Sequence, residues 1–420
     1  MGRDLTCLWR SSSALGVGEL TRFRIKFNLA KFLSHPTTTV KPFPLTVEVK
    51  NSTPLIYRGA LLTGPYNISA CVIPTRDLLT RNIYACLQLK PVLACGEIWR
   101  ATLDLPKEGV GDWTADIFSE VLFSPNKVEY EISVLAELPE GDYNLRSDND
   151  ATSDYENTVS YTPAIEYVVW KTEDIFGLPD LSSRKIGDDV HLVVLTHGLN
   201  GSALDKKYLK ERLDEKYNQQ TGTRVVPYVA DVNHASTWDG VEVCARRIAD
   251  KLLQIAGWPW NENIQDRTDK EEISTKPYIS KISLIGHSLG GLINVCLAGY
   301  LNSLTNGEFY RSIQAVNFIT VATPWLGSTE QPWYIKAGMQ AGAVGQTGKD
   351  LLAVQRTRSE QVQARGAAEE NTLEEEPLLL ALAHPSSPSH QALAKFQHRT
   401  VYANIVNDVS VSFRTASLYF

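Results

Sequence analysis

Hydrophobic and polar residues alternate one by one along much of the first third of the chain. The alternation is clear in residues 22–29, 45–50, 99–105 and 128–134, and it places one side of each strand in a core and the other in water. Turn residues separate these runs, and no long helical period competes with them. We expect a β-sandwich-like module over residues 1–140.

This module contains no catalytic constellation, so we interpret it as a structural or docking module. The alternative is a lipid-surface module that uses the cationic strand face of Arg22, Arg24 and Lys26, although charged strand faces usually serve solvation or edge protection. Residues 140–160 are rich in Asp, Asn and Ser and predict a linker. Residues 141–188 as a whole are expected to be this linker and a connecting segment.

From residue 189 to 420 the pattern changes to short continuous apolar runs that alternate with helical periods. This is typical of an α/β domain with a mostly parallel sheet covered by helices on both faces. The expected strands are residues 191–195, 224–229, 282–285, 315–321 and 400–406. A capping-box-like pair, Ser202 and Asp205, begins a helix that runs to about Tyr217, and a second helix ends at Gly257 and Pro259.

Composition narrows the functional classes. The chain has 420 residues, which suits two domains. Its net charge of −7 and the lack of Lys and Arg clusters argue against nucleic-acid binding. The six cysteines, Cys7, Cys71, Cys86, Cys95, Cys244 and Cys296, have no metal-site spacing and predict free thiols in a reducing compartment.

The same features indicate a cytoplasmic protein. The amino terminus lacks the continuous apolar core of a signal peptide, and Met1-Gly2 with Thr6 is a poor match to a myristoylation signal. Residues 282–301 approach the length of a membrane-spanning helix, but they contain His287, Ser288 and four glycines. We therefore expect strand, turn and helix there, and no transmembrane segment.

The strongest chemical motif is Gly286-His287-Ser288-Leu289-Gly290, a GxSxG pentapeptide between a predicted strand and a predicted helix. A sharp turn of this kind holds a nucleophilic serine in a strained conformation and leaves no room for side chains two residues away. Gly291 adds a third small residue. The motif predicts an α/β-hydrolase domain with Ser288 as the nucleophile and His287 in a structural role.

A second motif, His197-Gly198-Leu199, follows the strand at 191–195. In this fold the oxyanion is held by two backbone amides, one from this loop and one from the residue after the nucleophile. Leu199 and Leu289 are the candidates. His197 and Gly198 are expected to shape the loop, because the catalytic histidine of this fold comes last in chain order.

Asp408, after the last predicted strand, is the candidate acid that would orient a catalytic histidine. Asp350 is a weaker rival, and a turn or helix cap is the alternative role for Asp408. No histidine follows Asp408, and His234, His384, His390 and His398 would each require an unusual topology. The catalytic histidine is therefore unknown. We expect that the final strand and base are missing through truncation, or that the protein is not a hydrolase.

With these residues in place, the chain resembles the putative serine esterase family, which includes longer fungal putative lipases with an amino-terminal β module, and lipid-droplet phospholipases. The matching stretches in the second half are residues 195–199, 233–240, 285–292, 318–327, 402–408 and 414–417, and those in the first half are 18–23 and 58–66. Trp325 and Ser412 depart from the family pattern, as does the absent terminal histidine.

The resemblance implies hydrolysis of acylglycerol or phospholipid esters through Ser288 with Asp408 as the acid, and lipid degradation as the process. It implies a lipid ester partner, a peripheral place on membranes or lipid droplets, and no metal or organic cofactor. The family has a variable insertion at 349–395, here acidic at 369–376 and apolar at 378–382. This insertion is interpreted as either an interfacial lid or a disordered loop.

Two alternatives to the esterase remain open at this stage. One is a catalytically impaired or inactive lipid-binding or scaffold protein of the same fold, which would lack the base. The other is protein deacylation or amide hydrolysis by the same machinery.

Overall fold

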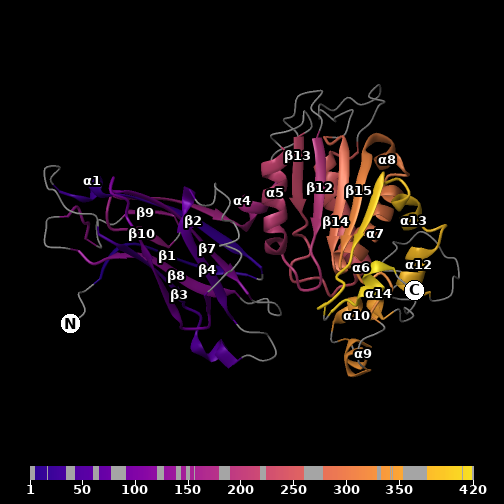
Figure 1. Cartoon of the computed structure of the whole chain (residues 1–420), viewed down its shortest axis with the longest axis horizontal. Helices are drawn as coiled ribbons and strands as arrows, with labels where there is room; N and C mark the ends of the chain where they lie inside the picture. Colours follow the sequence, from indigo (N-terminus) through magenta and orange to yellow (C-terminus); the bar gives the residue numbers. More distant parts are fainter. Residues whose placement is uncertain are drawn as a thin grey trace, which may run out of the picture. The chain divides into compact units, whose positions relative to one another are not determined.

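The structure is a computed structural model, and the chain divides into two compact units, residues Met1–Ile175 and Phe176–Phe420 (Figure 1). The structure describes residues 5–16, 18–34, 43–59, 66–76, 91–120, 127–138, 143–147, 152–155, 157–178, 190–217, 224–259, 278–328, 333–340, 342, 344–352, 376–408 and 410–418.

The first unit consists of two antiparallel sheets around one apolar core. One sheet has the order β6-β3-β8-β1-β10-β9 and the other the order β11-β2-β7-β4-β5. The strands are β1 (Thr6–Leu15), β2 (Leu20–Asn28), β3 (Leu45–Asn51), β4 (Ile68–Pro74), β5 (Val92–Leu93), β6 (Ile98–Leu103), β7 (Val110–Ser119), β8 (Val128–Ala136), β9 (Thr152–Tyr155), β10 (Thr158–Ser160) and β11 (Ile165–Lys171). Three short helical segments are α1 (Leu29–Phe32), η1 (Leu55–Gly59) and α4 (Thr172–Phe176).

Alternation explains the packing of these strands. In β2 the side chains of Phe23, Ile25 and Phe27 are buried and the intervening polar side chains are half-buried. The aromatic rings of Trp9, Phe23 and Tyr130 meet edge to face in the core. The alternating runs therefore form strands of this sandwich, as their pattern predicts.

The segment expected to be a linker contributes strands instead. β10 pairs with β1, and β11 pairs along its whole length with β2. Because β11 adds seven residues of main-chain pairing to the second sheet, the unit extends to Ile175 and does not end near residue 140.

The cationic strand face is neutralised by the neighbouring strand. Arg22 lies opposite Asp116 of β7 and binds it in a bidentate pair of 2.7 and 2.8 Å, while Arg24 binds Asp112. Paired guanidinium groups have little charge left for anionic lipid. The lipid-surface interpretation of this face therefore loses its main support.

The second unit contains a five-stranded parallel sheet of order β13-β12-β14-β15-β16. Its strands are β12 (Val190–Thr196), β13 (Arg224–Val229), β14 (Lys281–His287), β15 (Gln314–Val321) and β16 (His398–Tyr402). Its helices are η2 (Ala203–Lys206), α5 (Lys207–Tyr217), α6 (Val241–Ala256), α7 (Leu289–Leu304), α8 (Glu308–Ser312), α9 (Trp333–Gln340), α10 (Gly345–Leu351), α12 (Leu378–Ala383), α13 (Pro388–Leu393) and α14 (Phe413–Ser417).

Helices cover the sheet because strands such as β12 are apolar on both sides. Leu192 and Val194 of β12 belong to the core beneath α6 and α7, while Val193 and Leu195, which point the other way, are buried as well. In Figure 1 α7 lies beside the sheet, with α13 next to it. The prediction of an α/β domain with a parallel sheet covered by helices is therefore confirmed.

The membrane-like stretch at 282–301 is strand, turn and helix, formed by β14, Ser288 and α7. α6 ends at Gly257, which adopts the left-handed conformation of a helix C-cap. No helix in the described ranges combines the length and the hydropathy needed to cross a bilayer. Cys71, Cys95, Cys244 and Cys296 are buried free thiols and Cys7 is half-buried; Cys86 lies outside the described residues.

Two expectations about the carboxyl-terminal part need correction or restriction. The last strand, β16, ends at Tyr402 and not at residue 406, and the side chains of Ile405 and Val406 are 79% and 70% exposed. The acidic run at 369–375 lies outside the described residues. The apolar run that follows it forms α12, in which Leu378 is buried in the core and Leu380 is exposed; the lid interpretation stays a prediction.

Candidate active site

Ser288 occupies a sharp turn between β14 and α7. Its backbone has φ 53° and ψ −128°, a left-handed φ that costs a residue other than glycine roughly 1–3 kcal/mol. Two hydrogen bonds hold the turn against the end of β15 and the residues that follow it: the Ser288 amide donates to the Val321 carbonyl at 2.8 Å, and the Thr323 hydroxyl donates to the Ser288 carbonyl at 3.0 Å. This is the strained strand-to-helix turn that the GxSxG motif predicts.

Close backbone approach explains the glycines of the motif. A Cβ atom on Gly286 would lie 2.5 Å from the carbonyl oxygen of Gly290, and one on Gly290 would lie 2.5 Å from the carbonyl oxygen of Thr196. A Cβ on Gly291 would collide with the hydroxyl of Thr323. The start of α7 can therefore pack against β14, the end of β12 and the segment after β15 only because these three residues carry no side chain.

The loop after β12 lies directly against Ser288. A Cβ on Gly198 would be 2.9 Å from Cβ of Ser288, and the Gly201 amide donates to the Gly198 carbonyl at 3.0 Å to close a turn. In the described part of the chain, the amides of Leu199 and Leu289 donate to no other residue. The two predicted oxyanion donors thus flank the serine from two different elements.

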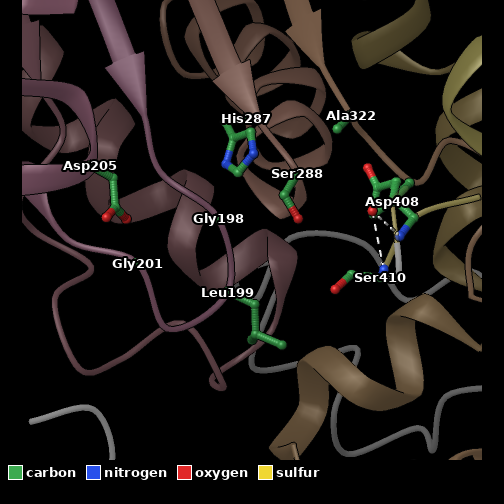
Figure 2. A pocket seen from close by; sticks show the side chains of 10 residues that line it. Gly198, Leu199, Gly201, Asp205, His287, Ser288, Ala322, Asp408 and Ser410 are labelled. Carbon is green, nitrogen blue, oxygen red and sulfur yellow. Dashed lines mark hydrogen bonds between the residues drawn. The ribbon is translucent and has the colours of Figure 1, made fainter. Parts of the chain in front are cut away.

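Asp408 lies on the other side of Ser288 from His287 in Figure 2. Its carboxylate accepts hydrogen bonds from the amides of Ser410 and Val411, at 3.1 and 2.9 Å, and from the Asn404 side chain at 2.8 Å. Burial alone would raise the pKa of Asp408, but these donors outweigh it and lower the pKa below its ordinary value. The group is a carboxylate at neutral pH.

These elements enclose a pocket of about 270 Å³. Its lining comes from the loop after β12, the Ser288 turn, the end of β15 and the segment after β16, and includes Gly198, Leu199, Gly201, Asp205, His287, Ser288, Ala322, Asp408, Ser410 and Val411. The strand register explains the convergence, because Thr196 pairs with Gly286, His287 with Val321, and Val321 with Tyr402. All four strands end at one edge, which is where parallel sheets place their sites.

His197 lies behind this loop, fully buried. Its Nδ1 donates to the Gly198 carbonyl at 3.1 Å, since a carbonyl can only accept, and its ring lies 5.5 Å from that of His234. Burial is the main cause that lowers the pKa of His197 to about 4. A neutral ring that contacts the loop backbone suits the loop-shaping role predicted for it.

The other histidines do not come together with Ser288 and Asp408. His234 accepts a hydrogen bond from the Ala203 amide at 2.8 Å, His384 bonds Ser386, and His398 begins β16 at the end of the strand away from the pocket. His287 is the one histidine in the pocket lining of the described residues, and partial burial, followed by the charge of Lys206, lowers its pKa. Within those residues no imidazole bridges the serine and the carboxylate.

The rival acid Asp350 has a structural role. It is buried, and its carboxylate accepts a hydrogen bond of 2.9 Å from the Val241 amide at the first turn of α6. It does not line the pocket.

Several pocket residues were missed from the sequence. Ala322, with φ 49°, follows β15 and lines the pocket, while the Asn404 side chain, outside the lining, and the amides of Ser410 and Val411 donate hydrogen bonds to Asp408. The position of Ala322 directly after a predicted strand was a usable signal. Backbone amides of a loop leave no sequence signal. No group of three His, Cys, Asp or Glu side chains suited to a metal occurs within the described ranges.

Comparison with known proteins gives one family over most of the second unit. The family model described as "Putative serine esterase (DUF676)" matches residues 187–418. A "Putative lipase" of Schizosaccharomyces pombe is 29% identical over 89% of this chain and 43% of its own length, and the "Putative lipase ROG1" of Saccharomyces cerevisiae is 30% identical over 98% of this chain and 55% of its own length. The chain thus spans about half the length of the curated relatives it matches.

Among solved structures, a lipase-esterase related protein from Clostridium acetobutylicum aligns over 55% of this chain and 90% of its own, at 12% identity and a TM-score of 0.24.

Proposed function

We propose that this chain, which belongs to the family described as "Putative serine esterase (DUF676)", hydrolyses acylglycerol or phospholipid esters through an acyl-enzyme on Ser288. The observation that carries the proposal is the backbone of Ser288, strained to φ 53° at a pocket where Gly198 lies against its side chain. Strain of this kind persists where surrounding contacts over-determine it, and it is concentrated at functional sites.

In the proposed reaction the Ser288 hydroxyl attacks the ester carbonyl, and its proton passes to a general base. The carbonyl oxygen becomes an oxyanion, which the Leu199 and Leu289 amides receive. The leaving alcohol takes the proton, and water then hydrolyses the acyl-enzyme by the same steps. Asp408 is proposed as the acid that orients and stabilises the base. The base itself is assigned to none of the described residues.

The proposal places the protein in lipid degradation, in the cytoplasm or at the surface of membranes or lipid droplets. Its support for a lipid ester is the naming of its relatives as lipases, together with exposed apolar side chains at the end of β16 and just after it, at Tyr402, Ile405 and Val406. No organic cofactor or metal takes part in the proposed steps.

The second candidate is a lipid-binding or scaffold protein of the same fold without turnover. The observation that favours it is the lack, among the described histidines, of one bridging Ser288 and Asp408. A serine hydrolase without its histidine retains only a small part of its rate enhancement.

A fluorophosphonate probe separates the two candidates. Labelling of the wild-type protein that disappears in Ser288→Ala supports the esterase, and hydrolysis of a panel of glycerolipid and phospholipid esters then identifies the substrate. Absence of both labelling and turnover in a well-folded wild-type protein would overturn the esterase and support the scaffold.

A further inference from the structure

The segment Thr237-Trp238 has no part in the chemistry above, although the sequence singles it out. The structure places both residues against Asn200, the residue after the Leu199 oxyanion candidate. The Asn200 amide donates to the Thr237 hydroxyl at 3.0 Å, and Trp238 Nε1 donates to the Asn200 side-chain oxygen at 2.7 Å. One residue is thus held at its main chain and at its side chain.

Asn200 needs this support because of its backbone. It occupies the third position of the turn from Gly198 to Gly201 and has φ 54°, whereas Leu199 before it does not have a positive φ. This is the pattern of a type II turn, which favours Gly or Asn at its third position. The turn is therefore strained at Asn200, and the two hydrogen bonds resist its relaxation.

The turn sets the direction of the Leu199 amide. The Gly198 carbonyl accepts from both His197 Nδ1 and the Gly201 amide. In a planar trans peptide the N–H points away from the C=O. The hydrogen bonds that fix the Gly198 carbonyl on one side of this peptide therefore direct the Leu199 N–H to the opposite side. This direction is kept only while Asn200, the next residue, keeps its backbone conformation.

The Thr237-Trp238 segment is itself anchored. The Thr347 hydroxyl at the start of α10 donates to the Thr237 carbonyl at 2.6 Å and accepts from the Gly240 amide at 3.0 Å. A Cβ on Gly345 would lie 2.5 Å from the Trp238 carbonyl oxygen. Thr237 is also buried, so the two residues that bind Asn200 are themselves held in place.

We propose that Thr237 and Trp238 are positioning residues that clamp Asn200 and so hold the Leu199 amide in register for the oxyanion. This inference rests on the proposed function. Loss of one oxyanion donor costs about 10²–10³ in kcat in a serine hydrolase. Loosening the donor without removing it should cost less, about tenfold.

A double-mutant cycle tests the clamp on the full chain. Trp238→Phe removes the indole N–H and keeps most of the ring, while Asn200→Gly removes the acceptor and tolerates the positive φ. Trp238→Phe should lower kcat for an ester, and the rate of fluorophosphonate labelling, about tenfold, with KM changed less than twofold. In the Asn200→Gly background the same substitution should change kcat less than twofold, because the bond it removes is already absent.

Two matched controls accompany the cycle. Trp325→Phe also removes an indole N–H, but Trp325 Nε1 is buried and has no hydrogen-bond partner among the described residues, so its kcat should stay within about twofold of wild type. Thr237→Val should lower kcat and Thr237→Ser, which keeps the hydroxyl, should restore it. Equal losses from Trp238→Phe in both Asn200 backgrounds, or a loss confined to KM, would overturn the clamp.

Amide hydrogen exchange separates failure of the clamp from failure of the esterase. The clamp predicts faster exchange of the Asn200 amide in Trp238→Phe and Thr237→Val than in Trp325→Phe, whether or not the protein turns over. If exchange is unchanged in these variants, the clamp is wrong. If exchange rises but wild-type protein is not labelled, the clamp exists as a structural feature and its catalytic role falls with the proposed function.

Discussion

The amide of Ser288 donates a 2.8 Å hydrogen bond to the carbonyl of Val321, the last residue of β15. This bond ties the strained turn to a strand that is adjacent in the sheet and distant in the chain. The serine conformation is therefore fixed by the sheet as well as by its flanking glycines. Variants that disturb the packing of α7 on the sheet should affect stability and site together.

Gly290→Ala tests the packing that permits the turn. Its Cβ would meet the backbone carbonyls of Thr196 and His197 at 2.5 and 2.6 Å, and backbone cannot move aside as a side-chain end can. Overpacking of this kind costs about 3 kcal/mol, so calorimetry should show a melting temperature roughly 6–12 °C lower. In Gly16→Ala the new Cβ meets only the flexible Glu19 side chain at 3.2 Å, and that control should melt within about 2 °C of wild type.

Asp408→Asn tests the proposed acid. An amide at this position would turn a donor toward the Asn404 side chain and could no longer stabilise a cationic base. Fluorophosphonate labelling should slow by roughly 10²-fold or more. Asp350→Asn is the comparison: its amide oxygen can still accept from the Val241 amide, and its labelling should stay within about twofold of wild type. Equal slowing in both variants would contradict the assignment.

His197 should make stability depend on pH. Its folded pKa of about 4 lies below the ordinary 6.5, so the unfolded chain binds more protons between these values. The contribution of His197 to the free energy of unfolding is fully present above pH 6.5. As the pH falls from 6.5 toward 4, the free energy of unfolding decreases by about 3 kcal/mol, because the unfolded chain takes up the proton first. Urea unfolding at pH 7 and pH 4 measures the decrease in the free energy of unfolding between the two pH values. This decrease should be about 3 kcal/mol larger in wild type than in His197→Asn, whose amide can donate to the same carbonyl. If the free energy of unfolding depended on pH in the same way in both proteins, His197 would not be a buried neutral imidazole.

The ion pairs of the first unit should differ in strength. The Asp116 side chain is 3% exposed and its partner Arg22 17%, while Arg24 and Asp112 are 38% and 31% exposed. Arg22→Met removes the bidentate cationic partner of a buried carboxylate and should lower the free energy of unfolding by about 2–3 kcal/mol. Arg24→Met should cost about 1 kcal/mol or less. Chemical denaturation of the two variants measures the difference, and equal effects would contradict this assignment of burial.

Most of the sheet of the second unit could be predicted because strands buried on both faces, such as β12 and β13, are continuously apolar. The bounds of β16, whose five residues are all exposed, were predicted less well. β13 has the predicted bounds, and β12, β14 and β15 differ from prediction by a few residues. β7 escaped prediction because buried polar residues interrupt its apolar pattern: Asp116 lies on the sheet face away from the core and is bound there by Arg22 of β2. Such partners are set by tertiary pairing, which no local pattern encodes.

The same distinction applies to the site. Ser288 and its glycines form a local motif, so their geometry could be read from the sequence. Asp408 is the sixth residue after β16, and its position depends on hydrogen bonds from the Ser410 and Val411 amides further along the same segment. The role of Asn200 depends on Thr237 and Trp238, more than thirty residues away. Contacts of that range appear only in three dimensions.

Peptide mapping after fluorophosphonate treatment tests the central claim most directly. The account predicts that mass spectrometry finds the phosphonyl adduct on Ser288 alone, that Ser288→Ala carries no adduct, and that Ser288→Ala melts no lower than wild type, because alanine retains the turn without the hydroxyl. An adduct on another residue, or an unmodified Ser288 in folded protein, would contradict it.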